Sequence, residues 1–159
     1  MTVPIASEEF RANAKAVMHN PAMIALSYRP SLRVLLVEDD DIDAGIVSIF
    51  AGMSEKFDFD FTRVTNIPHA WEALKSGAFD LCLVDYWVGQ ETSLRLLTSL
   101  DRPGNHTATV VLSNISLRDV EMLRIPSGRA TFLSKGDCTA QSLENAVQAA
   151  LQSKPHAHA

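Results

Sequence analysis

The sequence predicts an α/β domain in which helices cover both faces of a doubly wound parallel sheet. From residue 33 onward, a short apolar run is followed by a segment of helical periodicity five times in succession. Most of these runs are continuous rather than alternating, which is typical of strands that are buried on both faces. Because strand–helix–strand connections are right-handed, repeated βα units give a parallel sheet with helices on both sides.

The five strands are expected where the chain is rich in β-branched and aromatic residues. The second run alternates at period two, whereas the others are continuous. The runs are RVLLV (33–37), FDFDFTRV (57–64), LCLV (81–84), TVVLS (109–113) and ATFLS (130–134).

Helices are expected between and after these strands, at residues 41–51, 67–76, 92–99, 117–124 and 140–152. The first has its apolar residues at helical spacing, namely Ile42, Ile46, Ile49 and Phe50. Pro68 is suited to the start of the second helix, and Gly77 to its end. Thr139 is a suitable N-cap for the last helix.

Residues 1–31 precede the βα pattern and form an apolar extension. Ser7 is suited to cap a helix from Glu8 to about His19. Such an extension needs a surface to cover, and its own domain, a partner protein and a swapped subunit of a homodimer are all open alternatives. The βα domain is expected over residues 32–152, and a disordered tail over residues 153–159.

Composition excludes several classes of function. The net charge of −5 argues against binding of nucleic acid, which normally requires a basic surface. No apolar run approaches the length of a membrane span, and the N-terminus lacks the features of a secretory signal. Two cysteines, Cys82 and Cys138, do not make a disulfide framework or a metal cluster, so we expect a cytoplasmic protein with reduced thiols.

Polar residues follow four of the five predicted strands. In a (βα)5 sheet with the flavodoxin-like strand order 2-1-3-4-5, ligands bind where the carboxyl ends of the strands meet. The first strand ends in Glu38 and Asp39, the third in Asp85, the fourth in Ser113, and the fifth runs into Lys135. Clustered carboxylates suit Mg²⁺, while a lysine and a hydroxyl suit phosphoryl oxygens. An aspartate can attack phosphorus and form an acyl phosphate.

Each of these residues also has a purely structural interpretation. The acids at 38–41 could cap the first helix, with Asp40 or Asp41 the best suited to that role. Lys135 alone could be a solvated loop residue, and Phe132 could be a core residue. For Trp87 the alternatives are a gate at the site or a contact with a partner, which we favour over a platform on which a ligand stacks.

The motifs together resemble the receiver domain of two-component response regulators. VLLVEDD (34–40) is similar to the family's acidic segment, and LVDYWVG (83–89) to its phosphoacceptor strand. VVLSN (110–114) and FLSKG (132–136) are similar to the segments that carry its hydroxyl and lysine. The resemblance covers roughly residues 32–152, with the motifs in the family's order and near its spacings.

The resemblance implies a role for each site residue. Asp85 would accept a phosphoryl group from a histidine kinase or phosphotransfer protein. Asp39, Asp85 and the Trp87 backbone carbonyl would bind Mg²⁺, with Glu38 acting through water. Lys135 and Ser113 would each bind a phosphoryl oxygen. Movement of Ser113 would then let Phe132 repack and change the surface of helix four, strand five and helix five, which an unknown protein target would bind.

Two positions depart from the family's usual pattern, because Gly89 and Gly136 stand where it often has proline. Neither change removes a catalytic group, but both affect loop shape. In the family, the residues two positions after the acceptor and two after the hydroxyl influence how water reaches the acyl phosphate. Here they are Trp87 and Ile115, which are apolar and cannot orient a water molecule. We therefore expect slow autodephosphorylation.

Three functions follow as hypotheses. The first is a stand-alone receiver that catalyses only its own phosphorylation and dephosphorylation, since the chain ends seven residues after the last predicted helix. The second is a phosphorylation-independent scaffold that acts through protein–protein contacts. The presence of all five site residues argues against it, since a scaffold would not need them. The third is a phosphohydrolase with an aspartyl-phosphate intermediate. Such enzymes usually have a second aspartate two residues after the nucleophile, where this chain has Trp87.

Overall fold

The computed structural model describes Lys15, residues 28–114 and residues 130–153. The chain divides into two compact units, Met1–Pro30 and Ser31–Ala159. The predicted extension helix from Glu8 to His19 and the tail 154–159 lie outside the described residues, apart from Lys15, which is helical.

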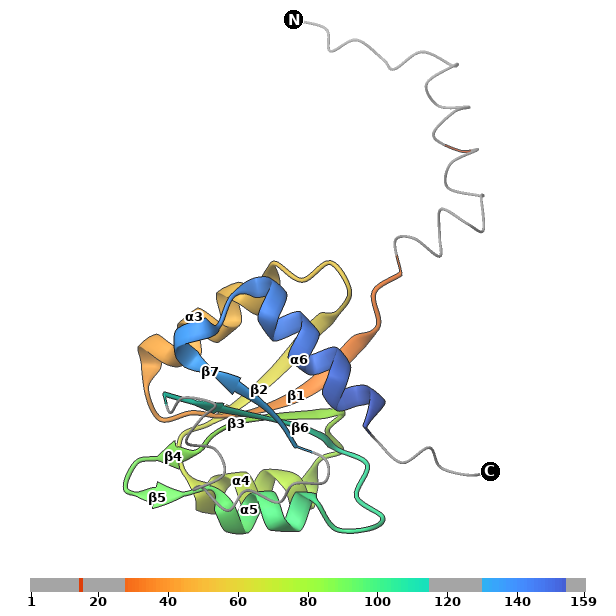
Figure 1. Ribbon diagram of the computed structural model, residues 1–159. Helices are drawn as coiled ribbons and strands as arrows, with labels where there is room; N and C mark the ends of the chain where they lie inside the picture. Colours follow the sequence, from red (N-terminus) through yellow and green to blue (C-terminus); the bar gives the residue numbers. More distant parts are fainter. Residues whose placement is uncertain (1–14, 16–27, 115–129, 154–159) are drawn as a thin grey trace, which may run out of the picture. The chain divides into compact units, whose positions relative to one another are not determined.

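The second unit is built on a parallel sheet of five strands (Figure 1). The spatial order β2-β1-β3-β6-β7 corresponds to 2-1-3-4-5 for the five predicted strands, so the predicted flavodoxin-like topology is confirmed. The strands are β1 (Ser31–Val37), β2 (Asp58–Val64), β3 (Leu81–Asp85), β6 (Ala108–Ser113) and β7 (Ala130–Ser134).

Helices cover both faces of this sheet (Figure 1). α3 (Asp41–Gly52) and α6 (Ala140–Gln152) cover one face, and α4 (Ile67–Ser76) and α5 (Leu94–Leu100) cover the other. A single 3₁₀ turn, η2 (Lys135–Asp137), joins β7 to the segment before α6. The predicted helix at 117–124 lies outside the described residues. Among the described helices, none has both the length and the apolar character needed to cross a membrane.

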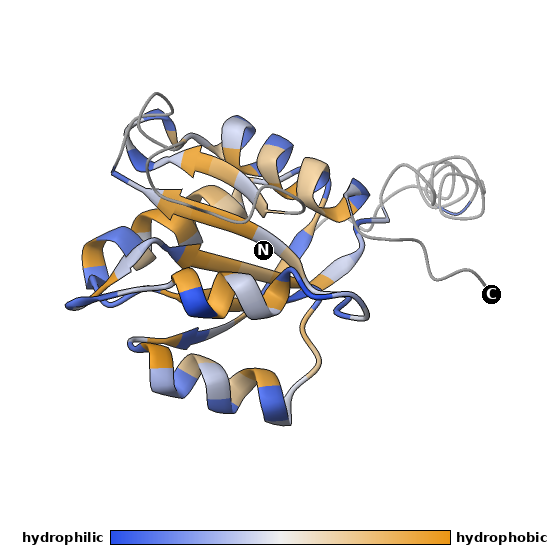
Figure 2. Cartoon of the chain, turned by 60° about the horizontal axis from the view of Figure 1, so that its bottom comes forward, coloured by the Kyte–Doolittle hydropathy of each residue, from blue (hydrophilic) through white to orange (hydrophobic). Residues whose placement is uncertain are grey.

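The core has two layers, one on each side of the sheet. Along β1, Val34 and Leu36 face the α3 and α6 side, while Leu35 and Val37 face the α4 and α5 side. All four are buried, which explains why this strand is a continuous apolar run. Figure 2 shows the same property as hydrophobic colour along the central strands, whereas the helices carry both polar and apolar residues.

α3 forms where its spacing predicted, but its large isoleucines do not face the core. Ile42 and Ile49 are 73% and 64% exposed, whereas Ala44, Val47 and Ala51 are buried against the sheet. Both sets have helical spacing, so periodicity alone predicts the helix without deciding which side is buried.

A short antiparallel hairpin follows β3 and was not predicted from the sequence. It consists of β4 (Trp87–Val88) and β5 (Glu91–Thr92), joined through Gly89 in the left-handed region at φ 63°. Because the second hairpin strand uses Thr92, α5 begins at Leu94 instead of the predicted residue 92.

Candidate functional site

The phosphoacceptor candidate Asp85 is the last residue of β3 and is 8% exposed. The register pairs Val37 with Val84, so the residues that follow β1 lie beside Asp85. Glu38 is the first of these and is completely buried. Its backbone N–H donates to the carbonyl of Val64 at 3.0 Å, which extends the β1–β2 pairing by one residue. The parallel strands therefore bring both carboxylates to the same edge of the sheet.

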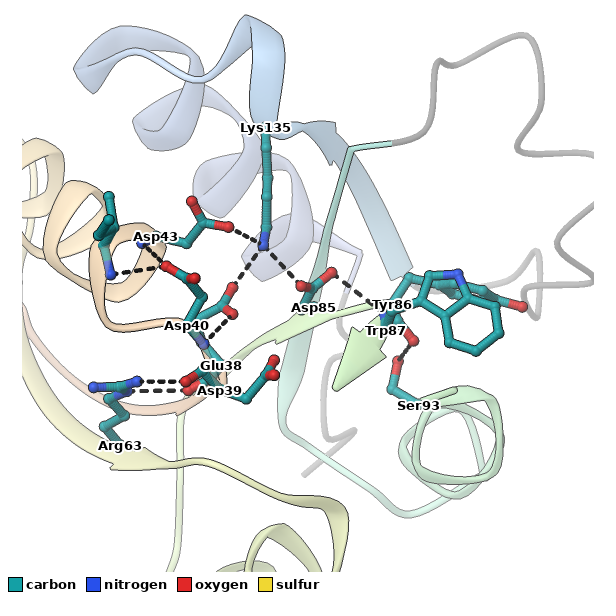
Figure 3. A network of polar contacts seen from close by, with 11 residues as sticks. Glu38, Asp39, Asp40, Asp43, Arg63, Asp85, Tyr86, Trp87, Ser93 and Lys135 are labelled. Atoms are coloured by element: carbon teal, nitrogen blue, oxygen red, sulfur yellow. Dashed lines mark hydrogen bonds and ion pairs between the residues drawn. The ribbon is translucent and has the colours of Figure 1, made fainter. Parts of the chain in front are cut away.

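Lys135 lies at the end of β7 and brings its ammonium to these carboxylates (Figure 3). Its Nζ donates to Glu38 Oε2, Asp43 Oδ2 and Asp85 Oδ2, each at 2.7 Å. An ammonium has three N–H donors, so these three carboxylates account for all of them. The lysine side chain is 12% exposed, which excludes the interpretation as a solvated loop residue.

Burial and charge shift the ionisation of this cluster in opposite directions. Burial raises the pKa of Asp85 and that of Glu38, although hydrogen bonds from Lys135 partly oppose the rise. Burial disfavours the charge of Lys135, but its bonds to Asp43, Asp85 and Glu38 outweigh this and raise the pKa of the ammonium. The ammonium therefore stays charged at neutral pH.

Three of the predicted metal ligands come together at the same point. Glu38, Asp39 and Asp85 each offer a carboxylate oxygen, and these oxygens lie within 4.8 Å of one another. An all-oxygen set that is partly open to solvent fits Mg²⁺, which retains several water ligands in proteins. The Trp87 backbone N–H donates to Asp85 Oδ1 at 3.4 Å, while the predicted role of its carbonyl stays a prediction.

The turn after β1 is fixed by Asp40 and Arg63. Asp40 is the N-cap of α3, and its Oδ1 accepts hydrogen bonds from the backbone N–H groups of Ile42 and Asp43. The structural interpretation therefore holds for Asp40 and leaves Glu38 available for the site. From β2, Arg63 donates to the Glu38 carbonyl at 3.0 Å and to the Asp41 carboxylate at 2.7 Å.

The remaining predicted residues lie around this centre. Ser113 ends β6 and is buried, and the register pairs Asp85 with Leu112, so Ser113 lies one residue beyond the level of the acceptor. Phe132 is half-buried and packs against the core on the α4 and α5 side. Ile115 lies outside the described residues.

Trp87 is half-exposed at the start of the hairpin, beside the acceptor. The preceding Tyr86 is buried, and the two rings meet edge to face with centroids 5.9 Å apart. The Ser93 backbone N–H donates to the Tyr86 carbonyl at 2.8 Å, which closes the hairpin at its base. The Ser93 hydroxyl donates to the same carbonyl at 3.3 Å (Figure 3).

Two residues of this network were missed by sequence reasoning, namely Asp43 and Arg63. The one signal for Asp43 was its position in the first turn of the predicted helix that follows Glu38 and Asp39. Arg63 pairs with Leu36 in the β1–β2 register, two residues before Glu38. The sequence could have indicated Arg63, because it is a basic residue near the end of the strand beside the acids.

Comparison with known proteins gives matches in structure only. No family model matches the chain, and neither does any curated protein. The signal receiver domain of NarL from Mycobacterium tuberculosis has a TM-score of 0.63 at 18% identity, covering 77% of this chain and 98% of that one. The chain has the receiver-domain fold. The receiver domain of Francisella response regulator 1452 has a TM-score of 0.59 at 21% identity, covering 76% of this chain and 97% of the other.

A third receiver domain supports the same assignment. The signal receiver domain of an HD domain-containing protein from Pseudomonas fluorescens Pf-5 has a TM-score of 0.60 at 22% identity and covers 78% of this chain and 88% of its own. The resemblance drawn from the sequence motifs is therefore confirmed for the fold. At these identities the roles of individual residues rest on the geometry of this receiver domain itself.

Proposed function

We propose that the chain is a cytoplasmic response-regulator receiver domain that accepts a phosphoryl group on Asp85 from a histidine kinase or phosphotransfer protein. The observation that carries this proposal is the contact of Lys135 Nζ with Asp85 Oδ2 at 2.7 Å, at a point where Glu38 and Asp39 also offer oxygens to a cation. A buried acceptor, a fixed ammonium and a divalent-cation site are the parts that phosphoryl transfer requires.

The chemistry assigns one task to each side chain. A carboxylate oxygen of Asp85 attacks phosphorus as the bond to the donor's leaving atom breaks, and the electron pair of that bond stays with the leaving group. Bound Mg²⁺ would supply positive charge to the phosphoryl oxygens. Lys135 neutralises a phosphoryl oxygen, and the Ser113 hydroxyl donates to another.

The proposed output is a change of surface, because this chemistry turns over no free substrate. Ser113 moves toward the phosphoryl group, and Phe132 fills the space that it leaves. This repacking alters the surface of β7 and α6, which a protein target binds. The predicted fourth helix of that surface lies outside the described residues. Trp87 lies beside the acceptor and has no group placed to orient water toward the acyl phosphate, so the phosphoryl group is long-lived. The same role for Ile115 is a prediction from the sequence alone. A half-life of seconds, unchanged by polar substitution at both positions, would contradict the long lifetime.

Intact-protein mass after incubation with acetyl phosphate and Mg²⁺ tests the proposal. We expect one added phosphoryl group in the wild type and none in Asp85→Ala. Asp80→Ala is the matched control, because Asp80 lies just before the opposite end of the same strand and pairs with Arg33. An adduct on Asp85→Ala, or no adduct on the wild type together with no binding of beryllofluoride, would contradict phosphorylation at Asp85.

A phosphorylation-independent scaffold is the second candidate, and one observation favours it. α3 exposes Ile42 and Ile49, and Met53 directly after the helix is also exposed, at intervals that place them along one side. Such a surface is suited to protein contact in any phosphorylation state. A partner that binds wild type and Asp85→Ala equally well, but does not bind Ile49→Ser, would support this function instead.

A further inference from the structure

Asp43 is the one partner of Lys135 that the proposed chemistry leaves without a task. It lies in the first turn of α3, and its Oδ2 accepts from Lys135 Nζ at 2.7 Å. The two other acceptors are the phosphoacceptor Asp85 and the cation ligand Glu38. Asp43 is not part of the group of oxygens suited to a metal ion.

Counting donors shows that the ammonium has no N–H left for an incoming anion. Lys135 has three N–H groups and three carboxylate partners at equal distances. A phosphoryl oxygen can therefore be bound by Lys135 only when one of the three existing hydrogen bonds is broken. The identity of the carboxylate that is released affects how easily the site accepts the phosphoryl group.

Burial indicates that Asp43 is the carboxylate that is released most easily. Its side chain is 32% exposed, compared with 1% for Glu38 and 12% for Asp85. A carboxylate that loses its cation must recover hydrogen bonds from water, which is costly for a buried group and cheaper for an exposed one. Asp43 can be rehydrated where it stands, at the solvent side of the cluster.

We propose that Asp43 is a positioning residue that competes with the phosphoryl group for Lys135. This inference rests on the proposed function of Asp85 as acceptor. When the phosphoryl group arrives, the hydrogen bond from Lys135 Nζ to Asp43 Oδ2 breaks and one from Nζ to a phosphoryl oxygen forms, with no proton transferred. Asp43 thereby stabilises the unphosphorylated state and weakens the binding of any phosphoryl-like anion.

Binding of beryllofluoride at saturating Mg²⁺, measured by titration calorimetry, tests this competition. Asp43→Asn keeps the shape of the side chain but gives Lys135 only a neutral acceptor. We expect about tenfold tighter binding of beryllofluoride, equivalent to about 1.4 kcal/mol. The affinity for Mg²⁺ alone and the unfolding midpoint are measured separately, because a merely structural role would change the midpoint and not the anion affinity.

Asp41→Asn is the matched control. It removes the same charge from the same turn of α3, but Asp41 contacts Arg63 at 2.7 Å and its side chain is 91% exposed. We expect the control to bind beryllofluoride as the wild type does. If Asp43→Asn binds beryllofluoride no more tightly than the wild type, Asp43 does not compete and the inference is wrong. An equal gain in Asp41→Asn would also overturn it, since general charge would then be the cause. A wild type that binds no beryllofluoride would instead contradict the proposed function and the inference with it.

Discussion

Replacing Lys135 by methionine tests whether one ammonium holds the acid cluster together. Methionine keeps a similar length and apolar stem but removes the charge and all three N–H donors. Glu38, Asp43 and Asp85 then lose their shared cation, and the first of them is completely buried. We expect the variant to fold with reduced stability in the absence of divalent cations.

The magnitude follows from the burial of the partners. Removing one member of a buried ion pair costs about 3–5 kcal/mol, because the remaining charge stays desolvated. The side chains of Lys135 and Asp43 are 12% and 32% exposed, so water relieves part of the penalty. We therefore expect a loss near the lower limit, about 3 kcal/mol in the free energy of unfolding.

Urea unfolding with and without Mg²⁺ is the assay. If Mg²⁺ binds to Glu38, Asp39 and Asp85 as proposed, it would supply the missing positive charge, and it should then stabilise Lys135→Met more than it stabilises the wild type. Lys75→Met is the control, since Lys75 forms a surface pair with Glu72 that is worth little.

Two results would refute the reasoning about Lys135. The first is a variant as stable as the wild type in the absence of Mg²⁺, which would mean that the three short contacts contribute nothing to folding. The second is an equal gain from Mg²⁺ in both proteins, which would mean that the ammonium and the cation do not act on the same carboxylates.

Three further predictions concern single elements of the fold. The pKa of Glu144 is lowered, chiefly by the hydrogen bond that it accepts from the hydroxyl of a buried serine. Glu144→Gln should therefore lower the free energy of unfolding by about 1–3 kcal/mol at neutral pH. This stabilisation is present above the ordinary glutamate pKa of about 4.3 and is lost as the pH falls through the lowered value, so the deficit should shrink in acid. Ile49→Ser should change the free energy of unfolding by less than about 0.5 kcal/mol because Ile49 is exposed. Val47→Ala should lower it by about 2 kcal/mol because Val47 is buried. Gly89→Ala should cost about 1 kcal/mol because of its positive φ, and Gly136→Ala should be nearly neutral.

Urea unfolding, over a range of pH for the glutamate, checks all three. A Glu144→Gln deficit that grows as the pH falls would contradict the assignment of a stabilising carboxylate. A larger loss for Ile49→Ser than for Val47→Ala would mean that the other side of α3 is buried. Equal effects of alanine at Gly89 and Gly136 would show that the hairpin turn carries no backbone strain.

Local signals explain why most elements could be predicted from the sequence. α4 and α6 begin and end at the expected residues, with a proline in the first turn of α4 and Thr139 as the N-cap of α6. Capping residues act within a few positions of the chain, and continuous apolar runs identify strands that are covered on both faces. The topology followed because repeated right-handed βα units leave few arrangements.

Features that depend on distant contacts could not be predicted in the same way. Ala44 and Val47 are buried on the sheet side of α3, but the exposed isoleucines have the same helical spacing, so only contacts made in the folded state distinguish the two sides. The β4–β5 hairpin has only two residues in each strand, too few for a periodic signal. The bond that closes its base joins Ser93 to the Tyr86 carbonyl, seven residues apart, and the sequence gives no signal for it.

The candidate site was predictable to the extent that strand ends define it. Glu38, Asp39, Asp85 and Lys135 each follow or end a strand, so a parallel sheet brings their backbones to one edge. Asp43 was not predicted as a site residue because it belongs to a helix, and its contact with the site depends on the direction in which the long Lys135 side chain extends. The positions of strand ends do not predict the direction of that side chain.

Charge balance sets the order of events in the proposed reaction. The Lys135 ammonium contacts three carboxylates, and Asp39 adds a fourth negative charge at the metal-binding group. At about 4 Å, each like-charge pair costs about 4 kcal/mol at an effective dielectric constant of about 20, so an anion entering this cluster alone meets a large barrier. A divalent cation held by this group would lower that barrier and would also neutralise Glu38 and Asp39. We therefore expect the cation to bind before the phosphoryl group, after which Lys135 would exchange a carboxylate for a phosphoryl oxygen.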